Sequence, residues 1–234
     1  IATGAWPSVP PVPGAELGIT SNEVFHLPAL PKRAVIAGAG YIANEFAGIF
    51  NELGVEVTLV TRGDKMLRSY DQEIVENLVG ISREKGIDIR MNFPFKGAQK
   101  QADGSILIDG GDAGTIETDL LMWAIGRVPN TSNLGLEDVG VVLDQTGAVV
   151  VGSDNRTNIE SIYAVGDVTN RVQLTPVAIR EGHAFADSVF GNNPRTIDYI
   201  CIPTAVFSNP PIAGVGMTEE EARTKLSDVK VYRS

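Results

Sequence analysis

The hydrophobic positions between residues 34 and 60 predict a strand, a helix and a second strand in succession. Residues 34–37 form a short apolar run without alternation, which is typical of a strand buried on both faces. Residues 41–53 predict a helix, because apolar residues recur there at helical spacing: Ile42, Phe46, Ile49, Phe50 and Leu53. Residues 55–60 predict the second strand, directly after the glycine that ends the helix.

Beyond residue 70 the pattern predicts a third strand and then a change of architecture. A helix is expected over residues 71–85, followed by a strand over 87–90. Between 93 and 118, isoleucines alternate with polar residues among Asp-Gly turns, which predicts a small antiparallel meander. A buried strand is expected over 120–125, and two further helices over 176–190 and 219–226. The expected fold class is α/β, with a Rossmann-like parallel sheet, helices and an antiparallel β-meander.

Composition excludes several classes of partner. The 234 residues carry a net charge of −10, which argues against nucleic acid, and no run approaches the roughly 20 apolar residues that cross a membrane. Cys201 is the only cysteine, so we expect no intramolecular disulfide, no CxxC redox pair and no metal site. The prolines between residues 5 and 18 predict an extended connector.

The motif Gly38-x-Gly40-x-x-Ala43 lies between the first strand and the first helix. In this strand–turn–helix context it predicts a dinucleotide site, whereas the glycine pattern alone would be weak. Gly38 suits the tight turn, Gly40 lets the backbone approach a pyrophosphate, and Ala43 allows the helix to pack closely on the strand. The helix N-terminus, with Tyr41 and Ile42, offers amide groups and a positive dipole to the phosphates.

The end of the second strand indicates which dinucleotide binds. An NAD site usually has an acidic residue there, roughly 20 residues beyond the first glycine, to bond the ribose hydroxyls. Thr61 occupies the expected position, Arg62 follows it, and Arg68 comes six residues later. Two guanidinium groups can hold a 2′-phosphate by bidentate hydrogen bonds, so the sequence predicts NADPH rather than NADH. The alternative is that both arginines are solvated surface residues.

Residues 40–50 and 61–71 resemble the NADPH domain of the glutathione reductases, homodimeric flavoenzymes of the pyridine nucleotide–disulfide oxidoreductase family. Four further segments resemble parts of the same family in the same order along the chain. They correspond to the strand that leaves the FAD domain, the segment that returns to it, the second FAD-contacting motif and the opening of the dimerisation domain: residues 1–4, 124–130, 157–168 and 203–208.

The resemblance implies a domain organisation and an activity. It implies a connector over 1–30, an NADPH-binding domain over 31–128, part of an FAD domain over 129–199 and the start of a dimerisation domain over 200–234. The implied enzyme is a cytoplasmic homodimer that reduces glutathione disulfide, with electrons passing from NADPH through FAD and a redox disulfide outside this chain. The chain alone is then expected to be inactive, to hold only part of the FAD site and to contain no catalytic residue.

The resemblance also implies roles for individual residues. Tyr41 corresponds to the residue that covers the flavin until nicotinamide displaces it, and Glu45 to the carboxylate that positions nicotinamide. Asp167 corresponds to the acid that binds the ribityl chain of FAD. The remaining positions implied in cofactor contact are Ile125, Gly126 and Arg127 for NADPH, and Gly166, Leu174 and Thr175 for FAD.

Other interpretations stay open at this point. Trypanothione reductase and mercuric reductase belong to the same family, whereas lipoamide dehydrogenase is disfavoured because Thr61 replaces the acid it would need. A stand-alone NADPH-binding module without catalysis is the alternative from a different functional class. His26 and His183 stand in neither of the motifs, and both are expected to be structural.

Overall fold

The structure, a computed structural model, describes residues 1–234 and divides into two compact units. The first, here called the sheet unit, comprises Pro7–Gly126 and Cys201–Ser234. The second, here called the loop unit, comprises Ile1–Trp6 and Arg127–Ile200. None of the helices is both long enough and apolar enough to cross a membrane.

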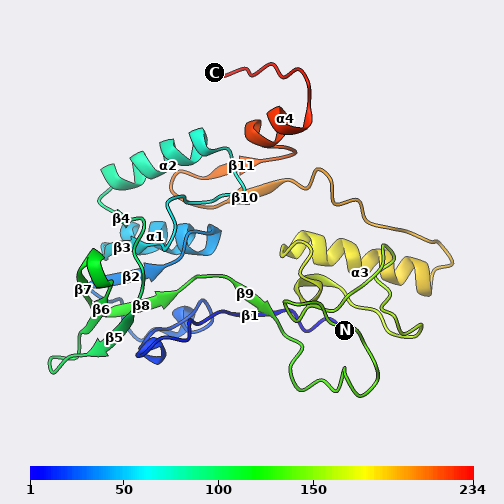
Figure 1. Ribbon diagram of the computed structural model, residues 1–234, viewed down its shortest axis with the longest axis horizontal. Helices are drawn as coiled ribbons and strands as arrows, with labels where there is room; N and C mark the ends of the chain where they lie inside the picture. The colour runs from blue at the N-terminus through cyan, green and yellow to red at the C-terminus, as the bar shows by residue number, and fades with distance from the viewer. The chain divides into compact units, whose positions relative to one another are not determined.

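A four-stranded parallel sheet forms the centre of the sheet unit (Figure 1). Its order is β4-β3-β2-β8, with β2 at Arg33–Ala37, β3 at Glu56–Val60, β4 at Asp88–Arg90 and β8 at Leu120–Trp123. All three strand pairs are parallel. The predicted strands are confirmed, although β8 ends two residues before the expected position.

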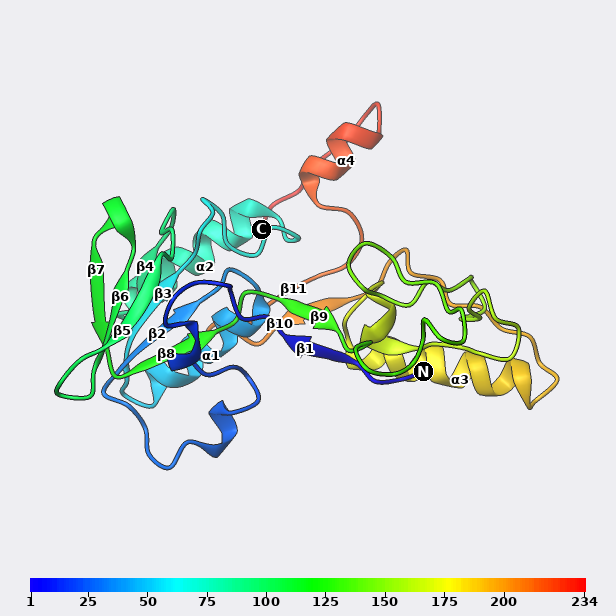
Figure 2. The ribbon, with the colours of Figure 1, turned by 60° about the horizontal axis from the view of Figure 1, so that its bottom comes forward.

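Two layers cover the two faces of this sheet. The helices α1 (Tyr41–Glu52) and α2 (Gln72–Glu84) lie on one face. The antiparallel meander lies on the other and consists of β5 (Gly97–Lys100), β6 (Ile106–Asp109) and β7 (Thr115–Thr118), with the short 3-10 helix η3 (Gly111–Ala113) between the last two (Figure 2).

Alternate side chains of β2 therefore enter two different cores. Ala34 and Ile36 pack in the helix-side core, while Val35 and Ala37 pack in the core beneath the meander. Burial on both faces explains why this strand is a continuous apolar run in the sequence, since neither face is left for water. The Rossmann-like sheet and the meander are both as predicted.

The buried face of α1 includes only part of the set of large apolar residues that predicted the helix: Phe50 is buried, and Ile42 and Phe46 pack partly against the same core. Ala43 and Ala47 are buried, whereas Ile49 and Leu53 are 49% and 58% exposed. Small side chains on the inner face let the helix axis lie close to β2 and β3, and larger ones would push it away. Helical spacing thus predicted the helix and part of its packed face, but it did not indicate the two alanines that lie against the sheet.

The prolines predicted an extended connector over residues 5–18, but residues 7–30 pack against the sheet. They contain two 3-10 helices, η1 (Ala15–Leu17) and η2 (Val24–His26). The indole N–H of buried Trp123 donates to the carbonyl of Ala15 over 2.8 Å, and the backbone of Ile19 bonds to β8. A buried indole packs against neighbouring residues and needs an acceptor for its N–H group. Residues 15–19 supply both, so this segment is held against β8.

The last part of the sheet unit is a hairpin followed by a short helix. Strands β10 (Thr204–Val206) and β11 (Ile212–Gly214) pair in an antiparallel manner, and Val206 is buried in the helix-side core. Helix α4 (Glu219–Lys225) begins with a capping box in which the side chains of Thr218 and Glu221 bond each other's backbone amides.

The loop unit has few regular elements. Strand β1 (Ala5–Pro7) pairs with β9 (Arg127–Pro129), and a 3-10 helix, η4 (Gly166–Thr169), precedes helix α3 (Thr175–Val189). A small core holds the turns together: Leu136, Val141, Val149, Ala164 and Val168. Helix α3 confirms the helix predicted over 176–190.

Candidate functional site

The glycine-rich turn lies at the point where the strand order of the sheet reverses. The chain runs from β2 through α1 to β3 on one side, and β8 lies on the other side of β2. Open α/β sheets bind ligands outside the carboxyl ends of their strands at such a switch point. Gly38 directly follows β2 and Ala124 directly follows β8, so the predicted turn stands at this position.

Glycine is found at the two positions of the motif for different physical reasons. A Cβ atom on Gly38 would lie 2.2 Å from the carbonyl oxygen of Ala124 and 3.1 Å from the Cβ of Ala43, so close packing requires glycine there. Gly40 has an ordinary φ of −85°, and a Cβ atom on it would meet no atom within 4 Å. Neither the backbone nor the packing requires glycine at position 40. The open space fits a group that approaches the backbone closely.

The start of α1 adds donors beside this space. Gly40 is the N-cap residue and no side chain caps the helix, so its first amides are not consumed by a side-chain acceptor. The buried Asn44 amide donates to the carbonyl of Gly40 over 2.8 Å, which holds the turn carbonyls against the helix. Asn44 was not singled out from the sequence. Its only indication in the sequence is a polar side chain one turn beyond Gly40, within the apolar pattern of the helix.

The loop that follows β3 is tied to the glycine turn. The amide of Leu67 donates to the carbonyl of Ala39 over 2.8 Å, and the side chains of Met66 and Leu67 are buried. Thr61 is also buried, and its hydroxyl oxygen accepts a hydrogen bond from the amide of Gly63. These contacts bring residues 61–68 beside the turn, which sequence spacing alone did not show.

Arg62 and Arg68 both belong to this anchored segment, near its beginning and at its end. Both side chains are exposed, and neither forms a hydrogen bond or an ion pair with another residue of the chain. The guanidinium of Arg68 lies over Gly63, where a Cβ atom would be 2.1 Å from its Nη2 atom. The two cations are therefore available to an anion at this edge of the sheet.

Tyr41 and Glu45 lie on the first two turns of α1. The Tyr41 side chain is 37% exposed. Glu45 is already engaged within the chain, because its Oε1 accepts a hydrogen bond from the amide of Phe207 over 2.9 Å. Two turns further on, the carboxylate of Glu52 accepts a hydrogen bond from the Asn209 side chain. The same face of α1 therefore holds the β10–β11 hairpin, a role that the sequence did not indicate.

We expect Glu45→Ala to loosen this hairpin. Loss of the acceptor leaves the Phe207 amide to water, and local opening of residues 204–212 should increase by an amount that corresponds to about 1 kcal/mol. Hydrogen exchange measured by mass spectrometry reports this opening. Glu45→Gln keeps an acceptor oxygen and is the matched control, with exchange expected to stay near that of the unchanged protein. Equal exchange in all three proteins would show that the contact does not hold the hairpin.

The remaining predicted residues fall in both units. Ile125 and Gly126 follow β8 in the sheet unit; Ile125 is 44% exposed and Gly126 has a φ of +128°. In the loop unit, the guanidinium of Arg127 donates to the Ala5 carbonyl and lies 3.8 Å from the carboxylate of Asp167. Two residues that the resemblance assigned to different cofactors thus form an ion pair with each other.

The candidate flavin residues surround the start of two helices in the loop unit. Gly166 and Asp167 begin η4, Leu174 is the N-cap of α3 and Thr175 is its first residue. The sequence missed Glu181, which is 1% exposed and accepts a hydrogen bond from the amide of Gly166. The feature that could have indicated this residue is its place on α3, where a carboxylate lies between the buried positions 177 and 184 of an amphipathic helix.

The Tyr199 hydroxyl donates to the same carboxylate over 2.5 Å. Burial raises the pKa of Tyr199 well above its usual value, and the hydrogen bond and the negative charge of Glu181 raise it further. Tyr199 is therefore a neutral donor over the whole physiological range of pH.

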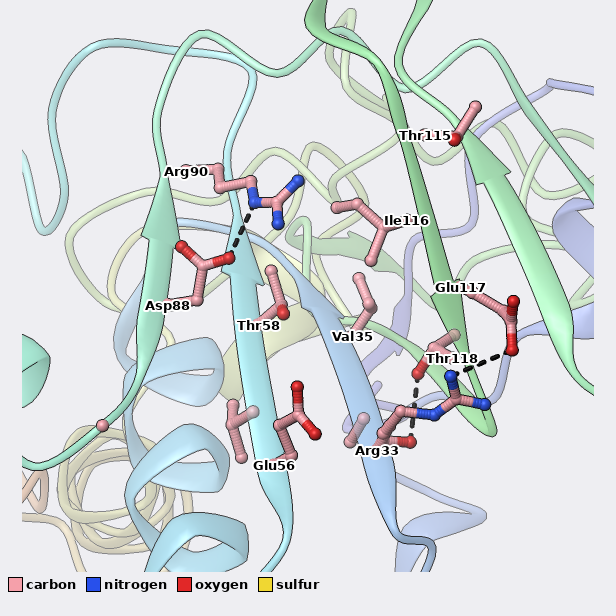
Figure 3. A pocket seen from close by; sticks show the side chains of 13 residues that line it. Arg33, Val35, Glu56, Thr58, Asp88, Arg90, Thr115, Ile116, Glu117 and Thr118 are labelled. Atoms are coloured by element: carbon pink, nitrogen blue, oxygen red, sulfur yellow. Dashed lines mark hydrogen bonds and ion pairs between the residues drawn. The ribbon is translucent and has the colours of Figure 1, made fainter.

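A separate cavity of about 310 Å³ opens at the other end of the sheet. Figure 3 shows that side chains of β2, β3, β4 and β7 line it. Arg33, Glu56 and Asp88 are the first residues of their strands, so the cavity lies at the amino ends, away from the glycine turn. Its cations are paired internally, Arg33 with Glu117 and Arg90 with Asp88. The sequence singled out none of these residues.

Comparison with known proteins relates the whole chain to one family of enzymes. A family model described as pyridine nucleotide-disulphide oxidoreductase matches residues 1–182. A second model, for the dimerisation domain of the same proteins, matches residues 202–234.

Individual relatives match over the whole chain. Glutathione reductase from Burkholderia cepacia is 51% identical over 100% of the chain and 52% of its own length. Trypanothione reductase from Trypanosoma congolense is 44% identical over 100% of the chain and 48% of its own length. The chain thus spans about half the length of the curated relatives it matches.

A solved structure has the same fold. The HOCl-induced flavoprotein disulfide reductase RclA from Escherichia coli superposes with a TM-score of 0.91 at 33% identity. The superposition covers 97% of this chain and 52% of that one.

Proposed function

Because the chain belongs to the pyridine nucleotide-disulphide oxidoreductase family, we propose that it forms the NADPH-binding half of a flavin-dependent disulfide reductase. The disulfide substrate is glutathione disulfide, and the intact enzyme is a cytoplasmic homodimer. The dimer is supported by the match of residues 202–234 to the dimerisation domain, and the substrate by the likeness to glutathione reductases.

The open space at Gly40 is the observation that supports dinucleotide binding most directly. No requirement of the chain itself keeps position 40 free of a side chain, and a pyrophosphate at the N-terminus of α1 would use both the space and the amides. The adenosine end would then extend along the carboxyl edge toward β3. Gly38, Ile42 and Ala43 shape this turn, while Ile125 and Gly126 border it from β8.

The arginines beside this turn support NADPH over NADH. Arg62 and Arg68 are exposed cations without a partner in the chain, and the Leu67–Ala39 hydrogen bond fixes their loop against the turn. A 2′-phosphate adds two negative charges that this pair can bind, whereas NADH offers only a neutral hydroxyl at that position.

The loop unit fits part of an FAD site. Helix α3 begins at Thr175 without a side-chain cap, so the Thr175 amide can donate to an electron-rich atom of a flavin ring. The next residue is a proline, and the Val177 amide already donates to the Leu174 carbonyl. Gly166 places the partly exposed carboxylate of Asp167 at the start of η4, where it can accept from a ribityl hydroxyl. The buried Nε atom of Arg171 has no hydrogen-bond partner in this chain, which supports an acceptor supplied from outside the chain.

The residues of this chain would bind and orient rather than react. FAD, when bound, would supply the redox chemistry that links NADPH to a disulfide. Tyr41 presents an aromatic face that can shield the flavin ring until nicotinamide arrives, and a plane of this kind can stack on either ring. Glu45 holds the hairpin against α1 and keeps a second carboxylate oxygen for the carboxamide of nicotinamide.

Trypanothione reductase is the second candidate, because relatives with that name are 44% and 46% identical over the whole chain. The two candidates share both cofactors and differ in the disulfide.

The test uses the full-length protein, purified without added cofactor. We expect a stoichiometric yellow flavoprotein that oxidises NADPH when glutathione disulfide is added, with much less activity on trypanothione disulfide and with NADH. Activity on trypanothione disulfide alone would show that the proposed substrate is wrong and that the proposed enzyme class is right. A colourless protein that binds NADPH and reduces neither disulfide would instead indicate a binding module without catalysis.

A further inference from the structure

Helix α3 carries a buried carboxylate that the proposed function does not use. Glu181 is 1% exposed, although ionisable side chains are rarely buried without a specific set of partners. Its two oxygens contact two segments that are distant in the sequence. Oε2 accepts from the amide of Gly166 over 2.5 Å, and Oε1 accepts from the hydroxyl of Tyr199 over 2.5 Å.

Arg171 completes this cluster. Its Nη2 lies 3.9 Å from Glu181 Oε1, and its guanidinium lies 4.9 Å from the centre of the Tyr199 ring. The same guanidinium donates to the side chain of Asn155. One carboxylate therefore joins α3, the turn from residue 166 to 171 and the segment that ends at Ile200, all within the loop unit.

The backbone turn at Gly166 depends on Glu181, because this carboxylate is the only acceptor of the Gly166 amide. The Gly166 N–H bonds to Glu181 and to no backbone carbonyl. Gly166 has a φ of +77°, and a Cβ atom there would lie 3.3 Å from Ala178, so the backbone is both unusual and close to α3. Loss of the acceptor would leave a donor unsatisfied inside the protein, and the turn would have to shift toward water.

We propose that Glu181 is a positioning residue for the flavin: by holding the Gly166 amide, it sets the turn that presents Asp167 to the cofactor. The inference rests on the proposed function, because it concerns the flavin site assigned there. Tyr199 acts from the other side, since its hydroxyl fixes the second oxygen of the carboxylate and so prevents it from rotating away from Gly166.

The test compares flavin affinity in variants of the full-length protein stripped of flavin and then titrated with FAD. Glu181→Leu removes the acceptor, and we expect the FAD dissociation constant to rise on the order of tenfold or more, as for the loss of one buried hydrogen bond. Glu181→Gln should stay within about threefold of the unchanged protein. Its amide oxygen can accept from Gly166 while its NH₂ donates to Tyr199, whose hydroxyl can also accept.

Asp187→Ala is the matched control on the same helix. It removes an exposed carboxylate whose contact is an ion pair with Arg195, and FAD affinity should not change. If Glu181→Leu does not fold, Glu181→Ala carries the same test, because it removes the acceptor without the bulk of leucine. An unchanged FAD dissociation constant in the folded variant would overturn the inference.

Hydrogen exchange separates this result from a failure of the proposed function. In the flavin-free protein, the amides of residues 165–170 should exchange at least about tenfold faster in Glu181→Leu, while those of 177–186 remain protected. If the unchanged protein binds no FAD, the proposed flavin site is wrong. Faster exchange would then still support the role of Glu181 in setting the turn, and unchanged exchange would overturn that role as well.

Discussion

Replacing Arg62 and Arg68 together by alanine is expected to weaken NADPH binding about 100-fold while NADH binding stays within about threefold. Each guanidinium can form charge-assisted hydrogen bonds with the 2′-phosphate, and such bonds contribute roughly 1.5–3 kcal/mol apiece. NADH has no phosphate at this position, so it gains nothing from the pair. Calorimetric titration with both cofactors measures the difference directly. The unchanged protein is expected to prefer NADPH by well over tenfold.

Lys65→Ala supplies the control for charge alone. It removes one exposed cation from the same loop, so it tests whether general attraction of an anion explains the preference. We expect less than about a threefold loss for NADPH in this variant. Equal losses of NADPH and NADH in the double arginine variant would show that these side chains do not bind the 2′-phosphate.

Gly40→Ala is expected to abolish binding of both dinucleotides and to leave the fold intact. The added methyl group meets no atom of the chain within 4 Å, and a φ of −85° suits alanine. It would, however, occupy the space through which a pyrophosphate approaches the backbone. We expect affinity to fall on the order of 100-fold or more, with the melting temperature within about 2 °C of the unchanged protein.

Gly38→Ala is the informative comparison, because the same methyl group is added two residues earlier. There it would lie 2.2 Å from the Ala124 carbonyl, so β2, β8 or α1 must move. We expect a loss of about 1–3 kcal/mol in the free energy of unfolding, measured by denaturant titration. A Gly40→Ala protein that binds NADPH normally would contradict the placement of the pyrophosphate at this turn.

Local patterns predicted most of the elements because each depends on neighbouring residues. The two-sided burial of β2 requires a continuous apolar run, and a strand of this kind followed by glycines and an amphipathic segment has few other solutions. The ends of α1 and α2 lie within about a residue of the expected positions, since glycine and aspartate act at helix ends through their own backbone geometry.

Contacts between distant residues account for what the sequence did not show. Prolines in residues 5–18 predicted an extended connector, but this segment packs on β8, where the Ala15 carbonyl accepts from the buried indole of Trp123. The apolar stripe of α1 marks its buried face only in part: Phe50 is buried, but the close approach to β2 favours alanine on that face and Ile49 is exposed. Neither effect is visible without the packing partner.

The sequence by itself determined the α/β class, the glycine turn and the absence of an acid at the end of β3, because a motif and its spacing contain this information locally. Only the tertiary structure decided that the arginine loop is tied to the turn through Leu67 and Ala39, and that Glu181 bonds Gly166. A hydrogen bond between distant segments depends on where the whole chain places its donor and acceptor. Its partners therefore emerge only when the fold has brought them within reach.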